Sequence, residues 1–272
     1  MQKIKRIALI LYSKLFSWDK KQVILIISSG RTGTNFMAHW FSELSDEIYS
    51  VHEPSPDLFQ IGIDKYRSKK EISIKFLKIN RALQLYKLNK SHKNVYIESN
   101  PNLILLLPEL NSLFKNIKII FIKREFETYL LSAINKSPDK SNKNYFYSET
   151  DPRKRITAID FNDEDYKEKW KTLFREEKIA WWWKKSNEVI DEYNTEYSNS
   201  IIVDYEILFN KNNENTLKKI LKFVGLQHLK LSQANLEYFR VKKNENKIKL
   251  VDDFMEIDEN LRERLNKIKI NR

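Results

Sequence analysis

The 272-residue chain contains no cysteine and only four histidines, at positions 39, 52, 92 and 228. The lack of cysteine excludes disulfides, thiolate nucleophiles, iron–sulfur clusters and cysteine-ligated zinc sites. The histidines show none of the spacings that are typical of metal ligands. We therefore expect no metal centre, and the composition is compatible with a reducing cytoplasm.

Long apolar segments are also missing. The basic stretch of residues 1–18 has one short apolar run, Ile7–Leu11, which is too short to span a bilayer and precedes no signal cleavage site. We therefore expect a cytoplasmic protein. Apolar residues of this stretch nevertheless share one helical face: Ile4, Ile7, Ala8, Leu11 and Leu15. Such a helix either packs on the protein or lies peripherally at a membrane surface, and the sequence leaves both alternatives open.

Basic residues outnumber acidic ones by 49 to 37, which gives a net charge of +12. This excess suits nucleic acid, an anionic membrane or small anions. We favour a solvated basic surface around a site for a small anion, and expect no nucleic acid partner. Two members of the run Trp181–Trp183 fall on the buried stripe of a predicted helix, so we interpret the run as core packing rather than base stacking. Apolar residues recurring from Ile72 to Tyr86 predict one amphipathic helix.

Glycine is scarce, yet two of the four glycines, Gly30 and Gly33, stand in one short loop. The unbroken apolar run Val23–Ile27 before it is typical of a strand buried on both faces, and helical spacing follows from Phe36. Glycine permits backbone angles that are closed to other residues, and a helix start adds partial positive charge. Polar side chains add donors: Thr32, Thr34 and Asn35. The segment therefore predicts a cradle for an anion.

The cation of this cradle is Arg31, which lies between the two glycines. A Walker nucleotide loop instead has four residues between its glycines and continues with Lys-Ser/Thr. The segment resembles the 5′-phosphosulfate-binding loop of the sulfotransferase family, roughly Pro-Arg/Lys-Ser-Gly-Thr-Thr, aligned on residues 30–35. The resemblance implies that the loop amides hold the 5′-phosphate, and that Arg31 stabilises the charge developing on the bridging oxygen as this phosphate leaves.

A second segment has the same resemblance. The apolar run Ile117–Lys123 predicts another buried strand, followed by Arg124 and, eight residues later, Ser132. Sulfotransferases place an arginine and a serine at this spacing to hold the 3′-phosphate of 3′-phosphoadenosine 5′-phosphosulfate (PAPS). A guanidinium offers a planar fork of donors to phosphate oxygens. Two positions depart from the family pattern, because Phe126 replaces a usual proline and Thr128 a usual aspartate.

The resemblance covers residues 22 to about 225 and implies a three-layer α/β/α fold with a central, mainly parallel sheet, like that of P-loop NTPases. We expect a single domain over residues 22–272, preceded by the basic segment 1–21 and containing a polar excursion at about 135–171. Tyr205, in a segment that resembles the family's Tyr-Glu-Asp-Leu, would reach the adenine. The late basic stretch with Lys242 and Lys243 would close over the 3′-phosphate.

Sulfuryl transfer to a hydroxyl requires a base. His52 and Glu53 follow Arg31 by 21 and 22 residues, beyond one predicted helix and a short strand. Sulfotransferases acting on tyrosylproteins and carbohydrates keep a glutamate near this spacing, so we favour Glu53, with His52 as the alternative. Strand alternation predicts opposite directions for the two side chains. A purely structural turn before Pro54 is the competing interpretation.

The sequence thus predicts a PAPS-dependent sulfotransferase that needs no metal and releases adenosine 3′,5′-bisphosphate. The acceptor would be a hydroxyl of a carbohydrate, a lipid or another metabolite. Two alternatives stay open: a P-loop kinase that uses ATP and Mg²⁺, and a non-catalytic nucleotide- or polyanion-binding protein on the same fold.

Overall fold

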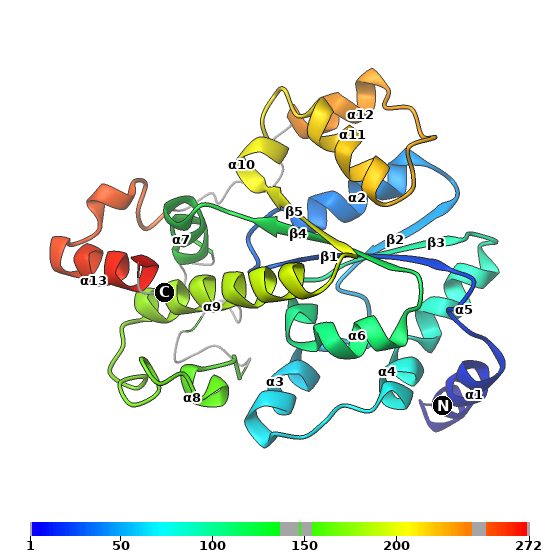
Figure 1. Ribbon diagram of the computed structural model, residues 1–272, viewed down its shortest axis with the longest axis horizontal. Coiled ribbons are helices and arrows are strands. Elements are labelled where there is room, and N and C mark those ends of the chain that lie inside the picture. The colour runs from blue at the N-terminus through cyan, green and yellow to red at the C-terminus, as the bar shows by residue number, and fades with distance from the viewer. Residues whose placement is uncertain (1, 137–146, 148–153, 241–248, 271–272) are drawn as a thin grey trace.

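The computed structural model describes residues 2–136, 147, 154–240 and 249–270. A five-stranded sheet in the order β2-β3-β1-β4-β5 forms its centre (Figure 1). Every neighbouring pair of strands is parallel. The strands are β1 Gln22–Ser28, β2 Ile48–His52, β3 Val95–Ser99, β4 Ile117–Lys123 and β5 Ser200–Asp204. Helices cover both faces, so the predicted three-layer α/β/α fold is confirmed.

The central strand β1 explains why its sequence is apolar throughout. Val23, Leu25 and Ile27 pack into the core on one face, whereas Ile24 and Ile26 pack into the core on the other. Both cores are therefore joined through one strand, and a polar residue in it would face one of them.

The larger core lies under most of the helices, which span the following ranges: α1 Gln2–Leu15, α3 Phe59–Ser68, α4 Ile74–Asn80, α5 Ala82–Lys90, η1 Pro101–Leu106, α6 Leu107–Leu113, α7 Phe126–Ile134, α8 Ala158–Phe161, α9 Arg175–Glu196, η3 Phe254–Glu256 and α13 Glu259–Ile270. The smaller core lies under the remaining ones: α2 Thr34–Leu44, α10 Tyr205–Leu208, α11 Glu214–Phe223, α12 Gln233–Glu237 and η2 Tyr238–Arg240.

The order of the strands creates a crevice at the carboxyl edge of the sheet. The chain leaves β1 through α2 on one face, and leaves the neighbouring β4 through α7 on the other. Adjacent carboxyl ends whose following helices diverge leave a gap between them, which is where parallel α/β sheets bind ligands. Both predicted anion-binding segments, after β1 and after β4, meet at this gap.

The region from Ile72 to Tyr86 differs from its prediction, because two helices, α4 and α5, replace one. The break falls at Arg81, whose side chain is fully buried and forms a paired contact with Glu98 on β3, with distances of 2.9 and 2.7 Å. A third guanidinium nitrogen, Nη1, donates to the carbonyl of Pro56. The two helices are therefore interrupted at the residue whose side chain enters the core.

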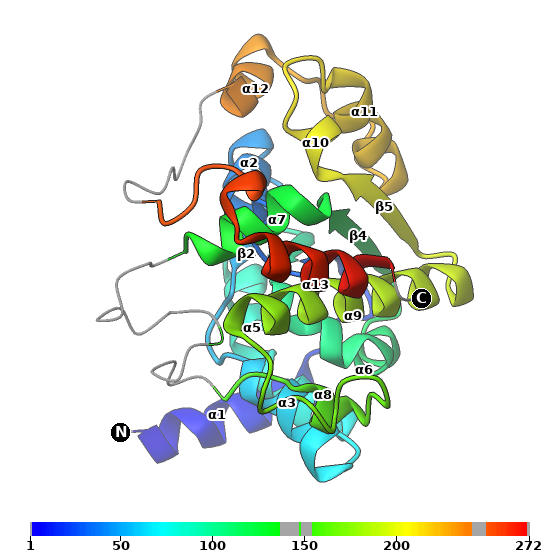
Figure 2. The same ribbon diagram turned by 90° about the vertical axis from the view of Figure 1, so that its left-hand side faces the viewer.

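The N-terminal helix α1 packs beside α4 and α5, away from the carboxyl edge of the sheet (Figures 1 and 2). None of the helices in the described part of the chain is long and apolar enough to cross a membrane.

Candidate active site

The loop between β1 and α2 forms a strained cradle. Gly30, Arg31 and Gly33 all have positive φ angles, of 90°, 57° and 72°. At Gly33 an added Cβ would lie 2.4 Å from Cζ of Phe209, so both the backbone angle and the space require glycine. At Gly30 no atom lies within 4 Å of such a Cβ, so the requirement there is conformational only.

Buried side chains hold this loop in place. The Thr32 hydroxyl donates to Oγ of Ser28 at 2.7 Å, and the amide of Gly30 donates to the same oxygen at 3.1 Å. Trp182 Nε1 donates to the carbonyl of Ser29 at 3.0 Å. Thr32, which the sequence predicted among the ligand donors, is fully buried, so its side chain shapes the loop instead of facing the cavity.

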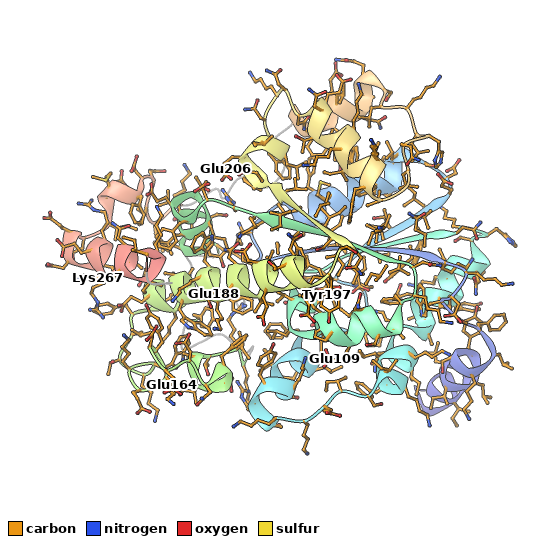
Figure 3. All side chains as sticks on the ribbon, in the orientation of Figure 1. Glu109, Glu164, Glu188, Tyr197, Glu206 and Lys267 are labelled. Atoms are coloured by element: carbon orange, nitrogen blue, oxygen red, sulfur yellow. The ribbon has the colours of Figure 1, made fainter. Side chains whose placement is uncertain are left out.

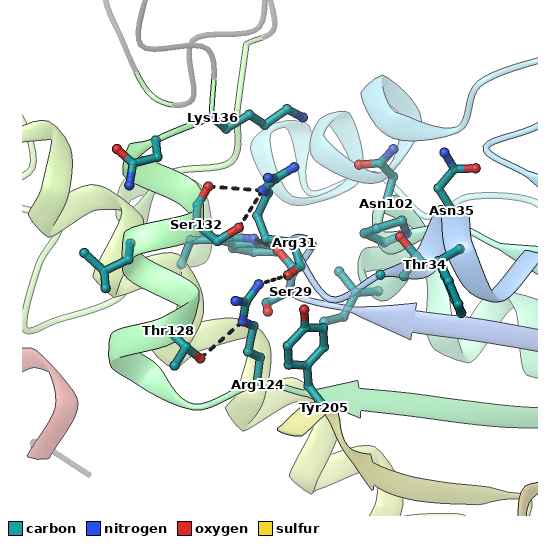
Figure 4. A pocket seen from close by; sticks show the side chains of 18 of the residues that line it. Ser29, Arg31, Thr34, Asn35, Asn102, Arg124, Thr128, Ser132, Lys136 and Tyr205 are labelled. Atoms are coloured by element: carbon teal, nitrogen blue, oxygen red, sulfur yellow. Dashed lines mark hydrogen bonds between the residues drawn. The ribbon is translucent and has the colours of Figure 1, made fainter. Parts of the chain in front are cut away.

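Arg31 and Arg124 converge next to Ser132 (Figure 4). Arg31 Nε donates to the carbonyl and to Oγ of Ser132, both at 3.2 Å, and Arg124 Nη1 donates to the carbonyl of Arg31 at 2.6 Å. Burial and the adjacent Arg124 charge lower the pKa of Arg31, and burial lowers the pKa of Arg124. Two half-buried cations side by side disfavour each other, and a bound anion would relieve this repulsion.

Several donors of these two guanidinium groups have no partner among the described residues. They are both Nη nitrogens of Arg31 and Nη2 of Arg124. Both side chains line the cavity described below. The pair can therefore offer a fork of charged donors to phosphate or sulfate oxygens.

Arg124 is held from three sides. Its guanidinium lies 4.2 Å from the ring centre of Tyr205, its Nε donates to Thr128 Oγ1 at 3.2 Å, and Trp183 Nε1 donates to its carbonyl at 2.8 Å. The Thr128 hydroxyl also lies 2.8 Å from Oε1 of Glu206, which is on α10 (Figure 3). The contact of Trp183 with Arg124 could not be predicted from the sequence, because helical periodicity indicates burial but not the direction of an indole N–H.

His52 and Glu53 both line the cavity, contrary to the alternation expected along a strand. β2 ends at His52, and Glu53 has a φ angle of 41°, which turns the chain out of the strand. His52 Nδ1 lies 2.8 Å from the carbonyl of Ser99. A carbonyl only accepts, so Nδ1 carries the proton and Nε2 of the neutral ring is free to accept one. Nε2 lies 3.9 Å from Oε1 of Glu53.

One cavity of about 1080 Å³ unites most of the predicted site. It is lined by ten of the predicted residues: Gly30, Arg31, Gly33, Thr34, Asn35, His52, Glu53, Arg124, Ser132 and Tyr205. Lys242 and Lys243 lie outside the described residues. Lining residues without a signal in the sequence include Asn102, Trp182 and Phe239, which come from elements that only the fold brings to this edge.

The sulfotransferase domain family matches residues 21–270. The fold is similar to the sulfotransferase domain from the curacin biosynthetic pathway, with 14% identity, a TM-score of 0.50 and coverage of 82% of this chain and 80% of that one. It is also similar to the sulfotransferase STF1 from Mycobacterium tuberculosis H37Rv, with 13% identity, a TM-score of 0.51 and coverage of 84% and 72%. No curated protein matches the chain. Because the family matches nearly the whole length of the chain, the chain belongs to the sulfotransferase family.

Proposed function

We propose that this sulfotransferase takes its sulfuryl group from PAPS and transfers it to a hydroxyl of a carbohydrate, a lipid or another metabolite. The observation that carries the donor assignment is the convergence of Arg31, Arg124 and Ser132 beside the strained cradle. Guanidinium donors that lack a partner within the described part of the chain line the same cavity. Such a cluster suits a ligand with two separate anionic groups better than a single phosphate. Membership of the sulfotransferase family favours PAPS over ATP.

The residues divide between the two ends of the donor. The amides of residues 30–35 and Arg31 would hold the 5′-phosphosulfate, and Arg124 with Ser132 would hold the 3′-phosphate. Tyr205, already stacked under Arg124, would contact the adenine. Lys242 and Lys243 stay proposed ligands of the 3′-phosphate. The Nη nitrogens of Arg31 have no partner among the described residues, so they can bind phosphate oxygens while Nε keeps its hydrogen bonds to Ser132.

The reaction breaks the bond between sulfur and the bridging phosphate oxygen and forms a bond between sulfur and the acceptor oxygen. The electron pair of the broken bond stays on the phosphate, where Arg31 stabilises it. The acceptor proton passes to Glu53, the base we favour, or to His52 Nε2, which the Ser99 carbonyl keeps unprotonated in the neutral ring. No step requires a metal ion.

A thermal-shift titration tests the donor assignment. Adenosine 3′,5′-bisphosphate and ATP are compared with and without Mg²⁺ on the unmodified chain, Arg124→Ala and Ser132→Ala. At ~100 times its dissociation constant, the bisphosphate should stabilise the fold by about 2.7 kcal/mol without metal. The control Arg67→Ala removes a surface arginine that pairs with Asp160 outside the cavity, and should leave the ligand-induced shift unchanged.

The outcomes separate the alternatives. Metal-independent stabilisation by the bisphosphate that weakens in both site variants supports the proposal. Stabilisation by ATP only with Mg²⁺ would move the protein to the kinase interpretation, and a lack of response to either nucleotide would favour a binding protein for another anion.

A further inference from the structure

Apolar residues of both cores line the cavity. Near Tyr205 the lining residues Phe36, Phe209 and Phe239 belong to the smaller core. Beyond Ser132 the lining changes to residues of the larger core, contributed by α3, η1, α7, α9 and the segment before α8: Phe59, Ile63, Ile104, Leu105, Leu131, Ile156 and Trp182. We call this second group the apolar wall; none of its residues is among the proposed contacts to the nucleotide.

The apolar wall adjoins the proposed base. The Ser99 carbonyl that orients His52 is followed by Asn100 and then by η1, which supplies Ile104 and Leu105 to the wall. Gly62 of α3 lies against Leu105, so α3 and η1 form one continuous surface. An acceptor whose hydroxyl reaches His52 or Glu53 would therefore rest its remaining atoms on this surface.

Three polar residues on this side of the cavity, Tyr147, Asn135 and Lys249, already have protein partners. The Tyr147 hydroxyl donates to the carbonyl of Ile156 at 2.8 Å. The Asn135 side chain donates to the carbonyl of Val251 at 2.7 Å and accepts from two amides. Lys249 pairs with Asp252 at 2.9 Å.

Arg155 lies 5.8 Å from the ring centre of Tyr147. A sugar needs several convergent, uncommitted partners, because each of its buried hydroxyls left unpaired weakens binding. Among the described residues, the apolar wall offers few such partners.

We infer, on the basis of the proposed function, that the acceptor hydroxyl is carried by an apolar body, an alkyl chain or a hydrocarbon ring, and not by a carbohydrate. Burial of this body against the apolar wall supplies the binding energy, and His52 and Glu53 supply the polar contacts at the reacting oxygen. The same chemistry fits a lipid alcohol and a compact cyclic alcohol.

The test uses two acceptor series on the full chain with PAPS. Straight 1-alkanols of increasing length are compared with cyclic alcohols of increasing ring size, and methyl glucoside serves as the sugar. We expect kcat/KM to rise by about fourfold per added methylene until the wall is covered, the value of one buried CH₂ group. The series in which kcat/KM rises farther shows whether the apolar body of the acceptor is a chain or a ring.

Two half-buried residues of the apolar wall allow a matched comparison. Phe59→Ala and Leu131→Ala should flatten the dependence on chain length while leaving stabilisation by adenosine 3′,5′-bisphosphate unchanged. The control Ile159→Ala removes a comparable apolar side chain that is 53% exposed and lies outside the cavity lining. Thermal denaturation of each variant confirms that it is folded.

The inference and the proposed function fail in different ways. Binding of the bisphosphate together with transfer to methyl glucoside, or with rates that do not depend on apolar size, would overturn the inference alone. If the bisphosphate binds and calorimetry shows no binding of any alcohol to that complex, the inference is likewise wrong. The absence of bisphosphate binding would instead remove the proposed function.

A second inference concerns α1, where three apolar side chains face solvent. Ile7, Leu11 and Leu15 are 58%, 53% and 78% exposed. The helix packs through its other side, where the ring of Tyr12 lies edge-on to Tyr86 and its hydroxyl accepts from Asn89 Nδ2 at 2.8 Å. Ile7, Leu11 and Leu15 therefore contribute little to this packing.

Exposed apolar and basic residues also occur at the end of α1 and on the neighbouring helices α4 and α5. The apolar ones are Phe16, Ile74, Phe76 and Tyr86, and the exposed lysines are Lys14, Lys75, Lys87 and Lys90. By sequence, residues 1–18 contain no carboxylate. We also infer that this surface docks on an anionic lipid membrane, since an apolar stripe bordered by lysines matches both layers of such an interface.

Vesicle sedimentation of the full chain tests this second inference. We expect binding to phosphatidylcholine vesicles that contain phosphatidylglycerol, weaker binding to phosphatidylcholine alone, and release at high salt. Leu11→Glu and Leu15→Glu should abolish binding, whereas the control Ile270→Glu, at an apolar residue of α13 that is 73% exposed, should not. The inference would be refuted if the protein did not sediment with the vesicles. It would also be refuted if gel filtration showed a dimer that Leu11→Glu or Leu15→Glu dissociates.

Discussion

At the scale of single residues, Gly30 and Gly33 separate two reasons for glycine in one loop. Both have positive φ, but only Gly33 lacks room for a Cβ because of Phe209. We predict that Gly30→Ala costs about 1–2 kcal/mol from the backbone alone. Gly33→Ala should cost distinctly more, since Phe209 must move as well. Urea denaturation of the two variants measures the difference, and equal losses would contradict this account.

The identity of the base is also a question of single residues. We predict that Glu53→Gln lowers the rate of transfer about 10²–10⁴-fold, with little change in donor affinity, if Glu53 accepts the proton. His52→Gln is the matched variant, since glutamine keeps a polar group near the Ser99 carbonyl. The larger loss of kcat identifies the base. Unchanged turnover in both variants would exclude the assignment of either residue.

At the scale of elements, the sequence predicts the helices and strands that depend on interactions between residues close in the chain. The strand Val23–Ile27, the helix after Gly33 and the arginine after β4 follow from apolar spacing and turn chemistry alone. The break between α4 and α5 could not be predicted, because it depends on the pairing of Arg81 with Glu98 on a strand that the sequence does not place. The burial of Thr32 could not be predicted for a similar reason, since its hydrogen bond to Ser28 depends on the folded loop.

Helix α9 connects the core to the site through two of its three consecutive indoles. Trp182 and Trp183 donate to the carbonyls of Ser29 and Arg124, whereas Trp181 donates to Asp163, away from the cavity. We predict that Trp183→Phe weakens binding of adenosine 3′,5′-bisphosphate about fivefold, which corresponds to the ~1 kcal/mol of one hydrogen bond.

Trp181→Phe is the control in that experiment. It removes an indole hydrogen bond on the same helix and should lower stability without changing nucleotide affinity. Calorimetric titration measures both variants, and equal affinities for Trp181→Phe and Trp183→Phe would show that the Arg124 carbonyl needs no such support.

At the scale of the whole molecule, the strand order decides which predicted residues meet. The sequence indicates two anion-binding segments, but their adjacency follows from β4 lying beside β1, and the position of His52 follows from β3 lying between β2 and β1. Pairings between distant strands have no local signal. The composition of the cavity wall opposite the arginines depends on the same topology, which is why the sequence left the acceptor open.

The extent of the domain is the last question at this scale. We predict that residues 22–272 unfold in one transition that includes α13, which lies along α9 (Figure 2). Arg264 on α13 makes two contacts, of 2.9 and 2.8 Å, with Glu177, a buried residue at the start of α9. Arg264→Ala leaves this carboxylate without its charged partner, and should lower the free energy of unfolding of the whole chain by about 1–3 kcal/mol.

The matched control is Lys269→Ala, which removes a longer surface pair with Glu127 at 3.6 Å and should change stability very little. Urea denaturation followed by tryptophan fluorescence and by circular dichroism distinguishes the possibilities. Coincident curves that shift together in Arg264→Ala mean that α13 belongs to the cooperative unit. A separate early transition confined to circular dichroism would mean that the domain ends before α13, since tryptophan is absent from residues 249–272.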